Sequence, residues 1–190
     1  MNDQSDLACV DQVVNGDIDA FSTLVDKYRR ETYTLALRIV KNEEDAEEVS
    51  QDAFVKAFKS IAKFKREAAF STWLYRIVYN TALSKIKKKQ LDSTSIEERH
   101  EEISASDTIQ SFQQLVKKDQ RKYIHHALNR LSEEEATLIN LHYINGKAME
   151  EVGKITGLSH SNVRVKIFRA RKKLHVYLHN ALKEEIRDIL

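Results

Sequence analysis

The sequence predicts an all-α protein made of two small helical domains joined by a flexible acidic linker. The 190 residues include no proline and only four glycines, while 42% are hydrophobic and 32% charged, a mix typical of soluble helical proteins. Apolar residues recur at helical spacing along most of the chain, and this spacing fades only between residues 91 and 117. Polar and acidic residues dominate that segment, so it has too little apolar surface to offset the entropy of ordering.

The amino-terminal domain, residues 1–90, is expected to contain three long helices. The first spans residues 20–40, with Asp17 as its cap. Asn42 is placed to cap the second helix, and the third is expected over residues 71–89. One face of each helix should enter a shared core. The residues of that core are predicted to be Ala20, Phe21, Leu24, Val25, Tyr28, Leu35, Ala36, Ile39, Val40, Ala46, Val49, Ala53, Phe54, Ala57, Phe58, Ile61, Trp73, Leu74, Ile77, Val78 and Ala82.

The carboxy-terminal domain, residues 118–190, carries the pattern of a helix-turn-helix. Residues 132–135 (Ser-Glu-Glu-Glu) form a capping box at the start of one helix. Gly153 lies inside a helical stretch, where glycine costs roughly 1 kcal/mol relative to alanine, and its missing side chain lets a second helix cross closely. Gly157 can adopt the left-handed turn conformation, and Ser159 can cap the helix that follows.

The helix after this turn has an apolar face and a strongly basic face. Its apolar stripe consists of Val163, Ile167, Ala170, Leu174 and Leu178. No acidic residue falls between residues 163 and 182, and such a helix suits the major groove of DNA, where arginine binds guanine and lysine holds phosphates. A solvated basic helix is the alternative. The residues expected to face DNA are Ser161, Asn162, Arg164, Val165, Lys166, Phe168, Arg169, Arg171, Lys172 and Lys173.

Charge is distributed unevenly along the chain, although the formal net charge is only +2. Six acidic residues lie within residues 43–52 and six more within residues 92–107, whereas six basic residues lie within residues 164–173. A second basic cluster falls within residues 85–89. Segregated charge of this kind indicates several partners of different sign.

No residue pattern points to an enzyme, a cofactor or a metal site. Glu97 and His100 form a single Glu-x-x-His motif, whereas a carboxylate di-iron site needs two. His125 and His126 are adjacent and have no cysteine cluster to complete a zinc site. The single cysteine, Cys9, fits a reducing compartment. Since no membrane span or secretion signal is evident either, the sequence predicts a cytoplasmic protein.

Three blocks of residues give the chain a specific resemblance. Residues 45–54 (DAEEVSQDAF) resemble the polymerase-binding helix of the extracytoplasmic-function sigma factors of bacterial RNA polymerase. Residues 70–80 (FSTWLYRIVYN) resemble the promoter-melting helix of that family, and residues 131–135 with 163–171 resemble its second DNA-binding domain. The resemblance covers nearly the whole chain. It implies a non-catalytic subunit that directs core RNA polymerase to promoters and helps to open them.

The resemblance assigns a partner to an acidic surface on the second helix. Carboxylates there project away from the apolar stripe. By the resemblance, this surface docks on the clamp helices of the largest polymerase subunit. The flap of the second-largest subunit is a further polymerase contact that the resemblance implies. An ordinary solvated face is the alternative. The residues expected to bind polymerase are Asp45, Glu47, Glu48, Gln51 and Asp52.

The third helix and the loop before it are expected to bind the melted minus-ten element of promoter DNA. Aromatic and guanidinium planes can stack unpaired bases, the Asn80 amide can bond a base edge, and nearby cations can hold phosphates. Trp73 is in phase with the core, and Tyr75 is expected opposite Trp73, although partial burial is an alternative for it. The residues expected to bind this element are Lys63, Phe64, Lys65, Arg66, Tyr75, Arg76, Tyr79 and Asn80.

Several alternatives stay open from the sequence. The basic helix would read the minus-thirty-five element by resemblance, but a helix-turn-helix regulator with an amino-terminal sensing domain has similar features. The acidic linker is either a mimic of nucleic acid inside the polymerase or a passive spacer, and an anti-sigma factor is a further possible partner. The chain departs from the family at Gly153, which is usually alanine, and at residues 66–69, where a glycine is often found.

Overall fold

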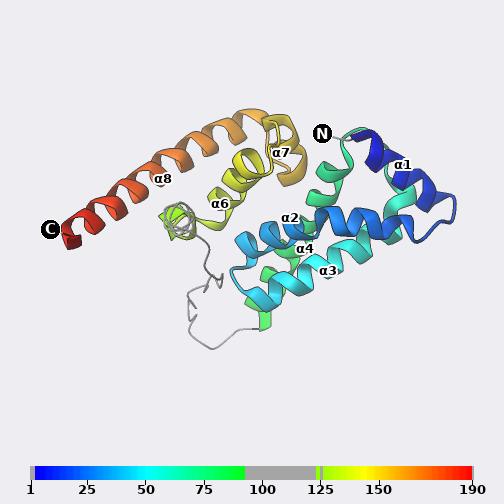
Figure 1. The fold of residues 1–190 in the computed structure, drawn as a ribbon, viewed down its shortest axis with the longest axis horizontal. Coiled ribbons are helices and arrows are strands. Elements are labelled where there is room, and N and C mark those ends of the chain that lie inside the picture. The colour runs from blue at the N-terminus through cyan, green and yellow to red at the C-terminus, as the bar shows by residue number, and fades with distance from the viewer. Residues whose placement is uncertain (1–2, 93–122, 125, 190) are drawn as a thin grey trace.

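The computed structural model describes residues 3–92, 123–124 and 126–189, and every regular element in them is a helix (Figure 1). The all-α prediction is confirmed. Residues 93–117 of the predicted linker lie outside the described residues, and Leu91 and Asp92 end the last helix of the amino-terminal unit. The elements are α1 (Asp3–Val14), α2 (Ala20–Val40), α3 (Glu43–Ser60), the 3₁₀ turn η1 (Ile61–Lys63), α4 (Phe70–Asp92), α6 (Glu133–Ile139), the π-helical turn η2 (Asn140–Ile144), α7 (Met149–Thr156) and α8 (His160–Ile189).

Both side chains predicted to cap the first two helices accept a hydrogen bond at a helix start, but only Asn42 occupies the N-cap position. The residue at the N-cap of α2 is Asp19, whose side chain makes no capping hydrogen bond. Asp17 Oδ1 accepts a hydrogen bond from the Ala20 N–H at 3.3 Å at the start of α2. Asn42 Oδ1 accepts one from the Asp45 N–H at 2.8 Å at the start of α3. Each hydrogen bond satisfies a backbone donor that the first turn of a helix leaves unpaired. The cap predicted at Asn42 is therefore confirmed, whereas Asp17 lies two residues before the N-cap of α2.

The helices α2, α3 and α4 pack into a bundle whose core follows the predicted apolar stripes. Leu24, Leu35 and Leu74 are fully buried there. Phe58 is an exception, because it is 37% exposed and its ring packs edge-on against Phe21 at the rim of the bundle, 5.1 Å between ring centres. The prediction that Phe58 belongs to the core is therefore wrong, since it lies at the margin of the apolar stripe of α3.

The short helix α1 was not predicted, and it extends the bundle across α2. Val10 and Val13 enter the core, while Asp6 is buried and accepts a hydrogen bond from the Tyr28 hydroxyl at 2.5 Å. Burial and the neighbouring Asp6 raise the pKa of the Tyr28 hydroxyl. A helix held by two valines and one buried carboxylate leaves only a weak periodic signal in the sequence, which is why the pattern did not indicate it.

The carboxy-terminal unit contains the predicted helix-turn-helix. Ser132 and Glu135 form the capping box of α6. Gly157 ends α7 with φ +78°, and Ser159 Oγ accepts from the Asn162 N–H at 3.3 Å in the first turn of α8. A Cβ at Gly153 would lie 2.9 Å from the Leu158 carbonyl oxygen and 4.0 Å from the nearest atom of Val163. The missing side chain therefore makes room mainly for the backbone of the turn and, to a lesser degree, for the crossing helix α8.

The two units pack against each other, with α7 on α4 and α6 on α2 (Figure 1). The buried guanidinium of Arg38 on α2 donates to Asn129 Oδ1 at 2.7 Å, and burial lowers the pKa of Arg38. Lys41, which follows α2, lies 4.0 Å from the Glu133 carboxylate. The recognition helix α8 extends away from this junction, so its far end is distant from the bundle (Figure 1).

Candidate nucleic-acid and polymerase interfaces

A cavity of about 350 Å³ lies beside the loop that joins α3 to α4. Five of the residues predicted for the minus-ten element line this α4 cavity, namely Lys63, Phe64, Lys65, Arg66 and Arg76. The remaining walls come from Glu67, Ala68, Thr72 and Trp73 of the same unit and from Lys154 of α7. The structure thus gathers most of the predicted loop residues around one concave surface.

Aromatic rings form the floor of the α4 cavity. The ring centre of Trp73 lies 5.1 Å from that of Phe64 and 5.7 Å from that of Phe70, and Phe70 is fully buried. Trp73 is only partly buried, so it packs on the core with one part and lines the cavity with another. Such a plane can stack an unpaired base, a contact worth roughly 1–3 kcal/mol.

The rim of the α4 cavity is cationic. Lys63, Lys65 and Arg76 are exposed, and an arrangement of this kind can hold the phosphates on either side of a base. Arg66 adopts a left-handed conformation with φ +60°, and its guanidinium is paired with the Asp11 carboxylate of α1. The helix α1 therefore contacts the loop that carries the predicted DNA-binding cations.

The other three residues predicted for the minus-ten element lie outside the cavity. Tyr75 was expected on the outer face of α4 beside Arg76, but it is 3% exposed, and burial raises its pKa. Tyr79 is half-buried; burial raises its pKa first, and the nearby Glu134 carboxylate of α6 contributes to the same direction. Asn80 is exposed. Tyr75 packs edge-on against Tyr28 of α2, 6.3 Å between ring centres, and the Lys147 ammonium of the other unit lies 5.5 Å from its ring centre. The sequence missed this division because these partners are distant along the chain.

The acidic surface predicted on α3 divides into an inner and an outer part. Asp45 is only 16% exposed in its side chain, where it contacts Lys85 at 3.4 Å and Lys89 at 2.9 Å. Burial acts to raise the pKa of Asp45, but these two ammonium groups outweigh it and hold the pKa below its usual value. Glu48 also contacts Lys85, at 2.6 Å. These two carboxylates therefore hold α4 against α3.

The outer part, which we name the acidic ridge, consists of Glu47, Gln51 and Asp52, all of them exposed. Beside it lies Val55, which is 50% exposed. Val55 was not among the predicted site residues, although an apolar residue outside the buried stripe of α3 could have indicated it. A ridge of carboxylates next to an apolar side chain is suited to a basic protein surface.

The reading face of α8 is open to solvent. Arg164, Phe168 and Arg169 are exposed, with Phe168 at 50%, and the Lys172 ammonium lies 5.0 Å from the ring centre of Phe168. Ser161, Asn162, Val165 and Arg171 of the predicted set are exposed as well. The predicted DNA-facing residues of the helix-turn-helix are thus mostly accessible.

Two lysines of that predicted set are engaged within the protein. The ammonium of Lys166 donates to the Glu134 carboxylate at 2.5 Å, and that of Lys173 donates to Glu135 at 2.7 Å. Burial acts to raise the pKa of Glu135, but the Lys173 ammonium and the capping hydrogen bonds outweigh it and lower the pKa. These two ion pairs hold α8 against α6.

The described residues contain no cluster of three or more histidine, cysteine, aspartate or glutamate side chains that could hold a metal ion. None of the helices in the described part of the chain has an apolar stretch long enough to cross a membrane.

Comparison with known protein families gives two matches along the chain. Residues 24–91 match the family described as Sigma-70 region 2, and residues 121–174 match Sigma-70, region 4. The first match contains the α4 cavity loop and the acidic ridge, and the second contains the helix-turn-helix. The helix α1 precedes both.

Relatives of similar length match over nearly the whole chain. The ECF RNA polymerase sigma factor SigW of Bacillus subtilis strain 168 is 31% identical, over 95% of this chain and 96% of the relative. The ECF RNA polymerase sigma-E factor of Escherichia coli K12 is 32% identical, over 90% of this chain and 92% of the relative.

Two solved structures share the fold. Sigma factor RpoE, in complex with the anti-sigma factor NepR from Bartonella quintana, has a TM-score of 0.70 at 21% identity and covers 85% of this chain and 98% of its own. CnrH, in complex with the cytosolic domain of CnrY, has a TM-score of 0.67 at 24% identity and covers 93% of this chain and 99% of its own.

Proposed function

The chain belongs to the extracytoplasmic-function sigma factors of bacterial RNA polymerase, and we propose that it reads a promoter with two surfaces, the α4 cavity and the reading face of α8. As a sigma factor it directs RNA polymerase to promoters for transcription initiation. One observation carries the two-surface assignment: a cationic, tryptophan-floored cavity is lined, apart from Lys154, by residues of the region 2 match, and an exposed basic helix begins within the region 4 match. A sensing domain in place of region 2 is not compatible with that match.

The α4 cavity binds one unpaired base of the melted minus-ten element. Its volume of about 350 Å³ lies within the roughly 300–1,000 Å³ of ligand pockets. Trp73 stacks on the base, while Arg76 and the loop cations hold the adjoining phosphates. A site that accepts only an extruded base favours strand opening, because the duplex hides what the site binds. Asn80 lies one turn beyond Arg76 on α4, where its amide can meet a neighbouring base edge.

The reading face of α8 binds the minus-thirty-five element in the major groove. Arg164 and Arg169 discriminate guanine through paired hydrogen bonds, and Phe168 meets a thymine methyl group. Lys172 and Arg171 hold phosphates and set the register without reading sequence. The support for this assignment is the exposure of these residues on a helix whose opposite face is buried.

The acidic ridge binds core polymerase at the clamp helices of its largest subunit, and the flap of the second-largest subunit is a further contact. Support for the first contact is the exposure of Glu47 and Asp52 beside Val55. The double variant Glu47→Lys/Asp52→Lys should weaken binding to core polymerase at least tenfold. Asp19→Lys/Asp26→Lys, just before and on α2, makes the same change in net charge at exposed positions and should leave binding intact. Equal affinity of both variants and the wild type for core polymerase would contradict the assignment of the acidic ridge as the polymerase-binding surface.

The two-surface proposal is tested by reconstitution with purified core polymerase and run-off transcription from genomic fragments. Wild-type protein should yield discrete transcripts that core polymerase alone does not yield. Arg76→Ala should lower open-complex formation at those promoters, while Arg169→Ala should lower their selection over unrelated DNA. If both variants select and open the same promoters as the wild type does, the surfaces are wrongly assigned.

Further parts of the proposal concern the limits of the domains and their partners. The domain limits 1–90 and 118–190, with a linker between, stay predictions. The two solved structures of the same fold are complexes with other proteins, CnrY and the anti-sigma factor NepR, which supports an anti-sigma partner for this chain. A cytoplasmic location follows from a partner that transcribes the chromosome.

A further inference from the structure

The loop of residues 64–69, between η1 and α4, contains a residue in an unfavourable backbone conformation. Arg66 has φ +60°, in the left-handed region, which favours glycine because a Cβ there lies too close to the following carbonyl oxygen. In the described part of the chain, Lys41 is the other non-glycine residue with a positive φ, and it ends α2, where its N–H donates to the Leu37 carbonyl oxygen. Arg66 ends no helix, because η1 ends at Lys63. Its conformation therefore needs a different support.

The side chain of Arg66 is held by the helix α1. Its guanidinium donates a hydrogen bond to the Asp11 carboxylate, and each of the two side chains is 49% exposed. The two residues are 55 positions apart in the sequence, but both belong to the amino-terminal unit, so the contact does not depend on where the carboxy-terminal unit lies. Because a half-exposed ion pair contributes little by itself, it can position the loop only if Asp11 is itself held in place.

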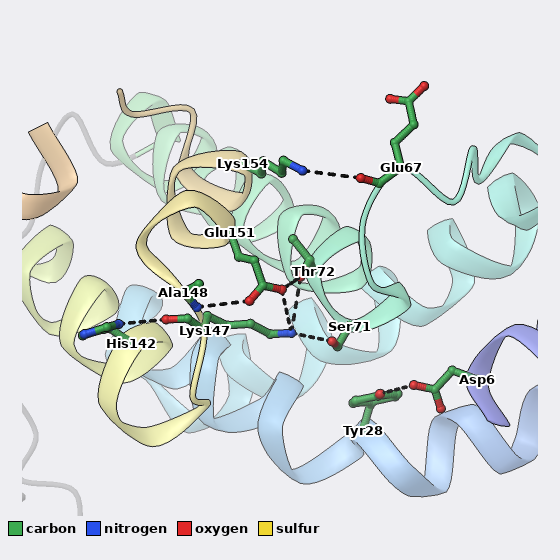
Figure 2. A network of polar contacts seen from close by, with 10 residues as sticks. All are labelled: Asp6, Tyr28, Glu67, Ser71, Thr72, His142, Lys147, Ala148, Glu151 and Lys154. Carbon is green, nitrogen blue, oxygen red and sulfur yellow. Dashed lines mark hydrogen bonds and ion pairs between the residues drawn. The ribbon is translucent and has the colours of Figure 1, made fainter. Parts of the chain in front are cut away.

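Asp11 is held in place because α1 is anchored on both sides of it. Val10 and Val13 are buried in the core of the unit. Asp6, in the preceding part of α1, is buried and accepts a hydrogen bond from the Tyr28 hydroxyl of α2 at 2.5 Å (Figure 2). The helix α1 also contacts η1 and α4. The Asp11 carboxylate is therefore presented to the loop from a packed helix.

The loop itself has few other supports. Its first residue, Phe64, is buried, and so is Phe70 directly after its end, but none of residues 65–69 is buried. A second contact to the loop comes from Lys154, which donates to the Glu67 carbonyl oxygen at 3.4 Å (Figure 2). That lysine belongs to the carboxy-terminal unit. Within the amino-terminal unit, the support for the middle of the loop comes from α1.

From these contacts we infer that α1 shapes the minus-ten site, with Asp11 as a positioning residue that holds Arg66 and, through it, the loop of residues 64–69. The inference rests on the proposed function of the α4 cavity. Lys65, Arg66 and Glu67 line that cavity, so the backbone at Arg66 decides where the loop cations lie relative to a base on Trp73. A loop that is ordered before DNA binds loses less conformational entropy on binding. The region 2 match begins only at residue 24, so the site extends to a helix outside that match.

Asp11 could affect DNA in two ways of opposite sign. As a support for the loop, it promotes promoter opening. As a negative charge beside a cationic rim, it repels phosphates and competes with them for the Arg66 guanidinium, and its removal would then strengthen DNA binding. The test therefore needs a background in which the support is unnecessary. Arg66→Gly provides that background, since glycine adopts φ +60° without a steric penalty.

A double-mutant cycle of full-length proteins separates the two effects. The wild type, Asp11→Ala, Arg66→Gly and the double variant are each combined with core polymerase, and the rate of open-complex formation is measured at a promoter identified by run-off transcription. We expect Asp11→Ala to lower this rate about threefold or more when Arg66 is present and to leave it nearly unchanged when glycine replaces Arg66. Asp19→Ala removes the same charge at an exposed position of the same unit and should behave as the wild type does. Equal affinity of all these proteins for core polymerase separates positioning from a general loss of structure.

Hydrogen exchange tests the support without DNA or polymerase. Exchange of the backbone amides of residues 64–69 is followed by mass spectrometry in the Lys154→Ala background, so that the contact from the carboxy-terminal unit is absent. Adding Asp11→Ala should speed this exchange about fivefold or more, because a less supported segment opens more often. Adding Asp19→Ala instead should leave it unchanged, and peptides from α3 should exchange alike in all three proteins.

The possible failures have different meanings. Unchanged exchange of the loop in Asp11→Ala, or a loss of opening rate that is the same with Arg66 and with glycine, would overturn the inference. Faster opening by Asp11→Ala would overturn it too, because Asp11 would then be a competitor of DNA and not a support. Absence of promoter-specific transcripts from the wild type would instead contradict the proposed function, whereas the exchange measurement, which uses no DNA, would still decide whether Asp11 supports the loop.

Discussion

The two proposed DNA-reading surfaces are built in opposite ways. The α4 cavity is concave, and its floor of Phe64 and Trp73 rests on the buried ring of Phe70. The reading face of α8 is convex, and residues such as Phe168 and Arg169 project from a helix whose opposite face holds the fold. In the first surface the aromatic ring proposed to stack the base packs directly on the core, whereas in the second the reading residues are separate from it.

This difference has a consequence for substitutions. A concave site cannot be changed without disturbing the packing that shapes it, because protein interiors are close-packed. An exposed helical face can be changed freely, since substitutions on a surface alter stability by roughly 0.5 kcal/mol or less. Sequence preference should therefore vary more easily in the carboxy-terminal unit than in the amino-terminal one.

The largest effect should come from a phenylalanine under the cavity. Phe70→Ala removes a fully buried ring that contacts Tyr28, Phe64 and Trp73, and such truncations cost about 3–5 kcal/mol. Urea unfolding followed by Trp73 fluorescence measures the loss in this unit. Phe168→Ala on the reading face is the matched control and should cost at most about 0.5 kcal/mol. A comparable loss in both variants would remove the contrast between the two surfaces.

An intermediate effect is expected at the turn that positions α8. In Gly153→Ala the new Cβ would lie 2.9 Å from the Leu158 carbonyl oxygen, and overpacking of this kind costs about 1–3 kcal/mol. Thermal unfolding and binding to minus-thirty-five duplex should both be impaired, because the turn sets the angle of α8. Glu150→Ala on the same helix is exposed and should change neither. An unaffected Gly153→Ala protein would mean that the turn backbone can shift at little cost.

On the reading face itself, substitutions should change DNA recognition without changing the free energy of unfolding. Arg169→Ala should lose about 1–3 kcal/mol of discrimination at particular base pairs, with no measurable change in unfolding. Lys172→Ala should weaken binding to all sequences alike and lower the slope of log affinity against log salt by about one. Competition binding at several salt concentrations distinguishes these outcomes. Identical behaviour of the two variants would indicate that α8 does not read sequence through Arg169.

The smallest effect should appear between α3 and α4. Asp45→Asn removes a carboxylate that pairs with Lys85 and Lys89, and pairs near the surface contribute about 0.2–1 kcal/mol. Because the pKa of Asp45 is lowered in the folded protein, this stability is present above its ordinary value of 3.8 and is lost as the pH falls through the folded value. Denaturation at pH 7 should therefore reveal a deficit that shrinks as the pH is lowered below 3.8. A deficit that is constant with pH would point to the helix start rather than to the ion pairs.

Local chemistry made most of the helical architecture predictable. The hydrogen bonds that Asp17 and Asn42 accept at helix starts, the capping box at Ser132 and the left-handed Gly157 depend on atoms within a few residues, so the sequence pattern contains them. The stripe that begins at Val163 is similarly local. The helix α1 escaped prediction because its burial depends on Tyr28 and on the core of another helix.

The candidate surfaces were likewise predictable only where they depend on contacts between residues close in sequence. The exposed residues of α8 were predicted as a set because helical spacing alone separates its two faces. Around α4 the helical spacing was insufficient to predict exposure, since Tyr75 packs against Tyr28 and Lys147 and Asp45 is paired with Lys89 of α4. These partners are distant in sequence, and helical periodicity gives no indication of them.

By itself the sequence determined that this chain is helical, that it carries a helix-turn-helix and that it resembles the sigma factors. Only the tertiary structure decided which side chains of α4 form a cavity, which carboxylates of α3 face outward and how the second unit covers the first. The physical reason is that backbone hydrogen bonds and helix faces are fixed over three or four residues. Cavities and buried charges such as Lys147 depend on side chains from distant parts of the chain that meet only after folding.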